Sequence, residues 1–164
     1  MHRFFLKVSN KRKIFFLTGF LSVLFCICVV FPILFINYFR LSGIGYFFIE
    51  NVLWCFISLV VFLYFLISGV YFYKINVDAY VINFVSYSIF FSFYKPKDYI
   101  DINHEMLFDY AFFNRPFSFN TTLMLKIISD NQRTIIKRFN LTFLSKKEIQ
   151  KMKNTLDYII AKNK

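Results

Sequence analysis

The residues best suited to catalysis or metal binding gather in one short segment, DINHEM (Asp101–Met106). Asp101, His104 and Glu105 within it are potential metal ligands. A metal centre needs further ligands at a matching spacing, and the only other histidine, His2, lies near the N-terminus. We therefore interpret DINHEM as a polar turn at the end of a strand, and we expect neither a metal nor a cofactor.

Sequence motifs of enzymes are also missing. The chain contains no G-x-x-x-x-G-K-S/T, G-x-G-x-x-G, H-E-x-x-H or G-x-S-x-G pattern. Its 4 glycines all lie at or before Gly69, which leaves none for a phosphate-binding loop in the polar C-terminal part. Cys26, Cys28 and Cys55 fall in apolar runs without His, Asp or Glu beside them, so we expect them to pack between helices. The sequence therefore predicts a protein that is not an enzyme.

Basic residues are the remaining chemical signal, because 20 Lys and Arg against 9 Asp and Glu give a net charge of +11. The candidates for a surface that contacts anionic lipid or an acidic partner are Lys11, Arg12, Lys13, Arg133, Lys137, Arg138, Lys146, Lys147 and Lys151. A simpler interpretation is a topology signal for the first three and a solvated face for the others. Basic and aromatic residues are not interleaved as in nucleic-acid platforms, so we expect no nucleic-acid partner.

The first half of the chain is strongly apolar, and between Ile14 and Tyr73 the only charged residues are Arg40 and Glu50. Two uncharged runs, Ile14–Ile36 and Asn51–Tyr73, flank the connector Asn37–Glu50. The first run would extend about 34 Å as a helix, enough for a hydrocarbon core of about 30 Å. It is too long for the apolar part of a signal peptide, and no small-x-small cleavage site follows it. We therefore predict a hairpin of two transmembrane helices.

The flanking charges predict the orientation of this hairpin. Residues 1–13 contain five basic residues and no acidic ones, so this tail is expected on the cytoplasmic side. Two crossings return the chain to the same side. We therefore expect an integral membrane protein of a bacterial or organellar inner membrane, with both termini on the cytoplasmic or matrix side.

Residues 74–164 are more polar and show the period of two that is typical of half-buried strands. The first strand is expected to place Ile75, Val77, Ala79 and Val81 inward. In Ser86–Tyr94 we expect Tyr87, Ile89, Phe91 and Phe93 on one face and Ser86, Ser88 and Ser92 on the other. Further strands are expected over Asp98–Ile102, Met106–Phe113 and a hairpin at Thr122–Phe143 with its turn at Asp130–Asn131.

The chain ends in an amphipathic helix, expected over about residues 145–162. Ser145 and Glu148 have the spacing of a capping box, which marks the start of a helix. The apolar stripe consists of Ile149, Met152, Leu156, Ile159 and Ile160. This stripe can lie on the preceding sheet or in a headgroup layer, and we favour the sheet because it contains no Trp or Phe.

Two N-terminal spans, short antiparallel strands and a final hairpin that leads through RFNLTFLSKKEIQKM (Arg138–Met152) into one capped helix resemble the bacterial PH-like membrane proteins. The resemblance implies a strongly bent, barrel-like pair of sheets that is closed by the last helix. We therefore expect an α+β membrane protein with a basic tail (1–13), a transmembrane hairpin (14–73) and a small antiparallel PH-like domain (74–164).

The function expected from this layout is that of a membrane-anchored, non-enzymatic adaptor or scaffold. Its domain would bind a protein or an anionic headgroup at the cytoplasmic surface, with the lipid bilayer and a protein partner or second copy as partners. An alternative is a structural accessory subunit of a larger membrane complex, such as a respiratory or organellar one. A further alternative is a membrane effector that senses a nucleotide.

Overall fold

The computed structural model describes residues 6–38, 43–90, 98–114, 116, 118–129 and 133–163. It divides into two units, which are described separately. The β unit comprises Met1–Lys11 and Gly69–Lys164, and the helical unit comprises Arg12–Ser68. Residues 12–68 are therefore an insertion in the sequence of the β unit.

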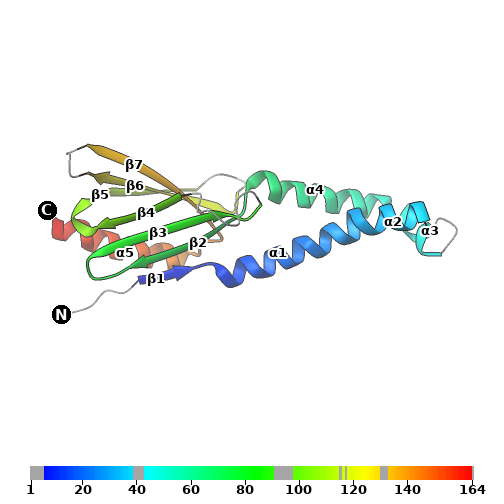
Figure 1. The fold of residues 1–164 in the computed structure, drawn as a ribbon, viewed down its shortest axis with the longest axis horizontal. Coiled ribbons are helices and arrows are strands. Elements are labelled where there is room, and N and C mark those ends of the chain that lie inside the picture. The colour runs from blue at the N-terminus through cyan, green and yellow to red at the C-terminus, as the bar shows by residue number, and fades with distance from the viewer. Residues whose placement is uncertain are drawn as a thin grey trace. The chain divides into compact units, whose positions relative to one another are not determined.

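The β unit contains two antiparallel sheets (Figure 1). The four-stranded sheet has the order β1 (Leu6–Ser9), β2 (Tyr71–Val77), β3 (Val81–Ser88) and β4 (Asp98–Asn103). The three-stranded sheet has the order β5 (Leu107–Asn114), β6 (Asn120–Ile128) and β7 (Thr134–Thr142). A short 3₁₀ turn, η2 (His104–Met106), connects the two sheets. An α+β fold with antiparallel sheets and a C-terminal helix is thus confirmed.

The N-terminal segment 1–13, expected to be a tail, contributes a strand. β1 pairs with β2 so that Leu6 lies opposite Val77 and Ser9 lies opposite Lys74. Val8 is buried in the core of the β unit. The expectation of a tail was wrong because a strand of four residues is too short to show a clear period.

The expected alternation of Ser86 and Ser88 against Tyr87 is confirmed, but which face is buried and the pattern of the first strand differ from expectation. Ser86 and Ser88 are buried on the inner face of β3, because Ile82 and Phe84 set its register and alternation brings every second residue to the same face. Tyr87 lies on the other face, and Phe91 and Phe93 fall outside the described residues. Ala79 is exposed in the turn between β2 and β3, which interrupts the expected alternation.

The terminal hairpin and helix agree with expectation. Leu123, Leu125 and Ile127 are buried on one face of β6, while the expected turn residues Asp130 and Asn131 lie outside the described residues. Helix α5 (Lys146–Asn163) runs alongside the strands (Figure 1). Its side chains Met152 and Leu156 join the hydrophobic core of the sheets, so the stripe packs on protein as favoured.

The capping box of α5 is formed as expected. The Ser145 amide donates to Glu148 Oε2 at 2.7 Å, and the Glu148 amide donates to Ser145 Oγ at 3.2 Å. Ser145→Ala should therefore lower the free energy of unfolding by about 1 kcal/mol, which corresponds to a fall in Tm of about 4 °C. Circular dichroism of the full chain in detergent measures this shift. The control Lys147→Ala, an exposed residue of the same turn, should leave Tm unchanged, and equal Tm values for both variants would contradict the prediction.

The helical unit begins with a continuous helical run through α1 (Lys11–Phe25), a π-helical turn η1 (Cys26–Val30) and α2 (Phe31–Tyr38). Within it, Lys11–Leu34 has 24 residues and is long and apolar enough to cross a membrane. α3 (Gly43–Glu50) and α4 (Val52–Ser68) follow, and the rings of Phe25 and Phe62 lie 5.2 Å apart. By length and composition, the described residues contain one candidate span.

The expected second span, Asn51–Tyr73, is therefore not confirmed. Its helix α4 has only 17 residues and ends at Ser68, and part of the expected connector is helix α3. Gly69 has φ +70, a left-handed conformation that ends helices and that glycine adopts without strain. The following residues enter β2, where the side chain of Tyr73 is fully buried. The domain boundary lies at Gly69 rather than at Lys74.

Candidate functional site

The predicted basic residues are all exposed, but they do not form one surface. Lys137 and Arg138 are neighbours on β7 and therefore point to opposite faces of the sheet. Arg133 precedes β7 and Lys146 follows it, and a strand of 9 residues extends about 30 Å. Arg12 and Lys13 lie in the first turn of α1, in the helical unit, and Lys151 lies one turn into α5.

Asn10 holds together the two ends of the β unit between which residues 12–68 are inserted. Its side chain is 1% exposed, and Nδ2 donates to the carbonyl oxygens of Tyr71 at 2.9 Å and Thr142 at 3.0 Å. Its Oδ1 accepts a hydrogen bond from the Tyr73 amide at 2.9 Å. One side chain thus connects the residue before Lys11, the start of β2 and the end of β7.

Further hydrogen bonds extend this connection to Asn120 of β6 and to Gly69. The Tyr71 amide donates to Thr142 Oγ1 at 2.9 Å, and Thr142 Oγ1 donates to Asn120 Oδ1. Asn120 Nδ2 donates to the Gly69 carbonyl at 2.9 Å. We call Asn10, Tyr71, Asn120 and Thr142 the junction network. A buried polar group without a hydrogen bond costs about 1–3 kcal/mol. The network therefore fixes the positions at which the chain leaves the β unit after Asn10 and returns to it at Gly69.

Three of the predicted basic residues belong to this end of the β unit. Lys11 follows Asn10 directly, and Lys146 and Lys147 follow shortly after Thr142. The exposed ring of Phe119 lies 5.3 Å from the ring of Phe143. The junction end therefore combines exposed cations with an aromatic pair, a combination that the sequence did not reveal.

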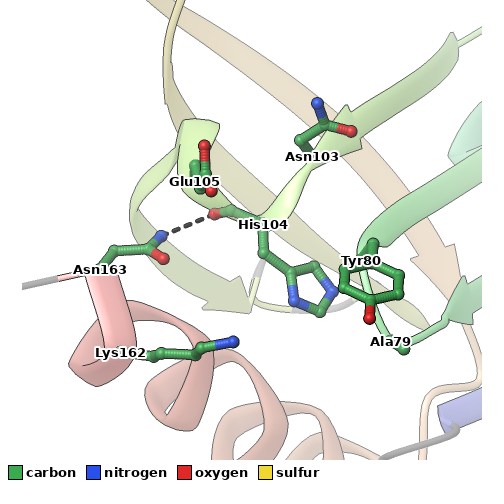
Figure 2. Close-up of a pocket in the computed structure, with 7 residues that line it drawn as sticks. All are labelled: Ala79, Tyr80, Asn103, His104, Glu105, Lys162 and Asn163. Atoms are coloured by element: carbon green, nitrogen blue, oxygen red, sulfur yellow. Dashed lines mark hydrogen bonds between the residues drawn. The ribbon is translucent and has the colours of Figure 1, made fainter.

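A cavity of about 470 Å³ lies at the other end of the four-stranded sheet. Tyr71 pairs with Ser88 and Val77 pairs with Ile82, so the turn after β2 is at the end of the strands away from the junction network. The cavity is lined by Ala79, Tyr80, Asn103, His104, Glu105, Lys162 and Asn163. Figure 2 shows the imidazole of His104 between the amino group of Lys162 and the ring of Tyr80.

Hydrogen bonds to main-chain carbonyl groups fix the walls of this cavity. Asn163 Nδ2 at the end of α5 donates to the His104 carbonyl at 2.6 Å and to the Leu107 carbonyl at 3.2 Å. The His104 amide donates to the Tyr80 carbonyl at 3.0 Å. η2 is thus a polar turn, as interpreted from the sequence, but sequence reasoning missed that Lys162 and Asn163 meet it. Because Lys162 and Asn163 are far from His104 in the sequence, no local sequence pattern indicates that they meet.

The surroundings of His104 favour the neutral form of its imidazole. Its Nε2 is buried and has no hydrogen-bond partner among the residues described. Burial lowers the pKa of His104, a backbone hydrogen bond with Asp78 partly offsets this effect, and the charge of Lys162 lowers the pKa further. Asp101 lies apart on β4, where its carboxylate accepts a bond from the Tyr99 hydroxyl at 3.3 Å. Within the described ranges, no cluster of His, Cys, Asp and Glu is suited to holding a metal.

The lowered pKa of His104 predicts a dependence of stability on acidification. Below the unfolded pKa of about 6.5, the unfolded chain binds a proton that folded His104 takes up only at lower pH. Stability is therefore complete above that value and falls as the pH drops towards the folded pKa. The decrease in Tm between pH 7.5 and pH 5 should be smaller in His104→Gln than in the wild type. Equal decreases in both proteins would contradict this prediction.

No protein-family model, curated protein sequence or solved structure matches this chain. The arrangement of its own residues is therefore the basis for assigning a function.

Proposed function

We propose that this protein is a membrane-anchored, non-enzymatic adaptor whose β unit binds an anionic headgroup or a protein at the cytoplasmic surface. The observation that carries the proposal is the connectivity of the chain. The apolar residues 12–68 are inserted between β1 and β2, which are neighbouring strands of one sheet. An anchor inserted in this way is attached to the β unit at both of its ends.

The surface of the helical unit supports an anchoring role. Large apolar side chains are exposed along its helices, among them Phe15, Phe16, Leu53, Trp54 and Ile67. Water-soluble proteins rarely expose contiguous apolar surfaces of this kind. Lipid is the solvent in which such side chains are stable, and Lys11–Leu34 has the length that a bilayer requires.

The connectivity also supports a topology in which both termini lie on one side. Because the chain returns to the sheet that it left, a first crossing by Lys11–Leu34 requires a second crossing before Gly69. α4 is the segment available for that crossing, and its 17 residues are at the lower limit of transmembrane helices. The basic residues at this end of the chain, Lys7 before α1 and Lys11, Arg12 and Lys13 in its first turn, favour the cytoplasm or matrix for this side.

The layout of the β unit supports the PH-like part of the proposal. In the described part of the chain, seven strands form a four-stranded and a three-stranded antiparallel sheet, and α5 closes their shared core. Two sheets and a closing helix are part of the arrangement that the resemblance to bacterial PH-like membrane proteins implies, and they support the proposal. Such a domain is a binding module in this proposal, in which Tyr80, His104 and Lys162 of the cavity serve as binding groups rather than catalytic ones.

Cysteine labelling in membranes tests the anchor and its topology. In a background with Cys26, Cys28 and Cys55 replaced by Ser, Gly43→Cys probes the start of α3 and Tyr80→Cys probes the β2–β3 turn. An impermeant maleimide should label Gly43→Cys only from the outer side and Tyr80→Cys only from the inner side. Labelling of both from one side would overturn the paired crossing, and extraction of the protein by alkaline carbonate would overturn the anchor.

An accessory subunit of a larger membrane complex is a second candidate, favoured by the outer face of the three-stranded sheet. Phe108, Phe113, Ile128 and Ile136 are exposed there. Lys126 lies 4.8 Å from the centre of the Phe108 ring. Extraction in mild detergent followed by sizing should reveal stoichiometric membrane partners if this candidate is correct, and the adaptor alone or as a small oligomer if it is not.

A further inference from the structure

We propose that the junction end of the β unit is a lipid-contacting surface that lies in an anionic headgroup layer. In this arrangement Phe119 and Phe143 reach the interface, and Lys11, Lys146 and Lys147 contact lipid phosphates. The inference rests on the proposed membrane anchor and adds to it a defined lipid surface on the domain.

The position of the aromatic pair follows from hydrogen bonds. The Phe143 amide donates to the Phe119 carbonyl at 3.0 Å. Phe143 directly follows Thr142 and Phe119 directly precedes Asn120, and both of these neighbours belong to the junction network. The two rings are therefore next to the points where the apolar segment leaves and re-enters the β unit.

The backbone of Phe143 has an unfavourable conformation. Its φ of 57° lies in the left-handed region, which costs a bulky residue about 1–2 kcal/mol and costs glycine little. The partner ring of Phe119 is 49% exposed. Phe119 is exposed and Phe143 is partly exposed, so an aromatic pair held at a strained position gains little in water, whereas aromatic rings are favoured at the membrane interface.

The charges at this end fit an external anion. Lys146 and Lys147 lie in the first turn of α5, where the helix dipole disfavours cations. The nearby carboxylate of Glu148 is bound by the amide and hydroxyl of Ser145, both at 2.7 Å. Lys11 is exposed immediately after the network. Anionic lipid would supply a counter-charge to these lysines, at about 1 kcal/mol per basic residue near the surface.

The far end of the sheet has a different character. It carries Glu105, Lys162 and His104 around the cavity, and burial lowers the pKa of His104. With the junction end in the headgroup layer, this cavity is at the end of the strands away from the lipid. Tyr80, which is 73% exposed in the turn at that end, therefore serves as a matched control.

Fluorescence quenching by brominated lipid tests the inference on the full chain. Trp54 is the only tryptophan, so Phe119→Trp and Tyr80→Trp are made in a Trp54→Phe background. In phosphatidylcholine–phosphatidylglycerol nanodiscs with bromines near the headgroup, Phe119→Trp should be quenched at least twofold and shifted to the blue. Tyr80→Trp should not respond. Circular dichroism checks that both variants fold, and Phe143→Trp replaces Phe119→Trp if that variant does not.

Quenching of the native Trp54 fluorescence shows whether the protein is anchored in the bilayer. It therefore distinguishes failure of the lipid-surface inference from failure of the proposed anchor. If Trp54 is quenched by brominated lipid and Phe119→Trp is not quenched, the lipid surface is wrong while the anchor stands. If neither is quenched, both proposals fail. Quenching of Phe119→Trp should weaken when phosphatidylglycerol is omitted and in the added pair Lys146→Gln and Lys147→Gln. Quenching unaffected by either change would overturn the role assigned to anionic lipid.

Discussion

Replacing residues 12–68 by a short glycine–serine linker should give a folded β unit that stays soluble and monomeric without detergent. The replaced segment carries the exposed apolar helices. Its two ends are close together, because the Asn10 side chain bonds to the Tyr71 carbonyl at 2.9 Å and Ser9 pairs with Lys74. A short linker closes this gap at small entropic cost. Size-exclusion chromatography and far-ultraviolet circular dichroism measure the outcome.

The fragment Gly69–Lys164 is the matched control for the linker variant. It lacks β1 and Asn10, so it loses the buried Val8 and leaves the edge of β2 unpaired. Unpaired edges promote association, and we expect this fragment to aggregate or to unfold at a much lower temperature. A linker variant that still requires detergent would show that the β unit itself is the apolar part. A fragment as stable as the linker variant would show that β1 is dispensable.

Asn10→Ala should cause the largest loss of stability of any single substitution considered for this protein. It removes three hydrogen bonds, to Tyr71, Thr142 and Tyr73, and leaves their main-chain groups without the partner that they have in the buried junction. At about 1–3 kcal/mol for each unsatisfied buried group, we expect a loss of about 4 kcal/mol after partial relaxation. Urea unfolding of the linker variant with and without the substitution measures this difference.

Asn76 provides a control of the same residue type in β2. Its Oδ1 is buried but has no hydrogen-bond partner within the described residues. Asn76→Ala therefore breaks no bond from this oxygen and should change the free energy of unfolding by less than about 1 kcal/mol. If both alanine variants lose the same stability, the junction network is not what holds the two chain ends together.

Features with local causes were predictable from the sequence. The capping box of Ser145 and Glu148 involves residues within one helical turn, and the alternation of Leu123, Leu125 and Ile127 reports one face of one strand. The apolar character of residues 14–36 likewise needs no information from elsewhere in the chain. These signals predicted the terminal hairpin, the final helix and the long apolar helix.

Other features depend on residues that are distant in the sequence. Asn10 and Thr142 are 132 positions apart, so no local pattern connects them. For the same reason, the cavity between His104 and Lys162 and the separation of Arg133 from Lys146 along β7 could not be predicted.

By itself, the sequence determined that one part of this chain is apolar enough for lipid and that the other part forms strands closed by a capped helix. Only the tertiary structure decided where the boundary lies. Tyr71–Tyr73 were assigned to a membrane helix but belong to β2, and Leu6–Ser9 were assigned to a tail but form β1. The physical reason is that burial in a protein core and burial in lipid select the same apolar side chains, and only the hydrogen-bond partners of the main chain distinguish them.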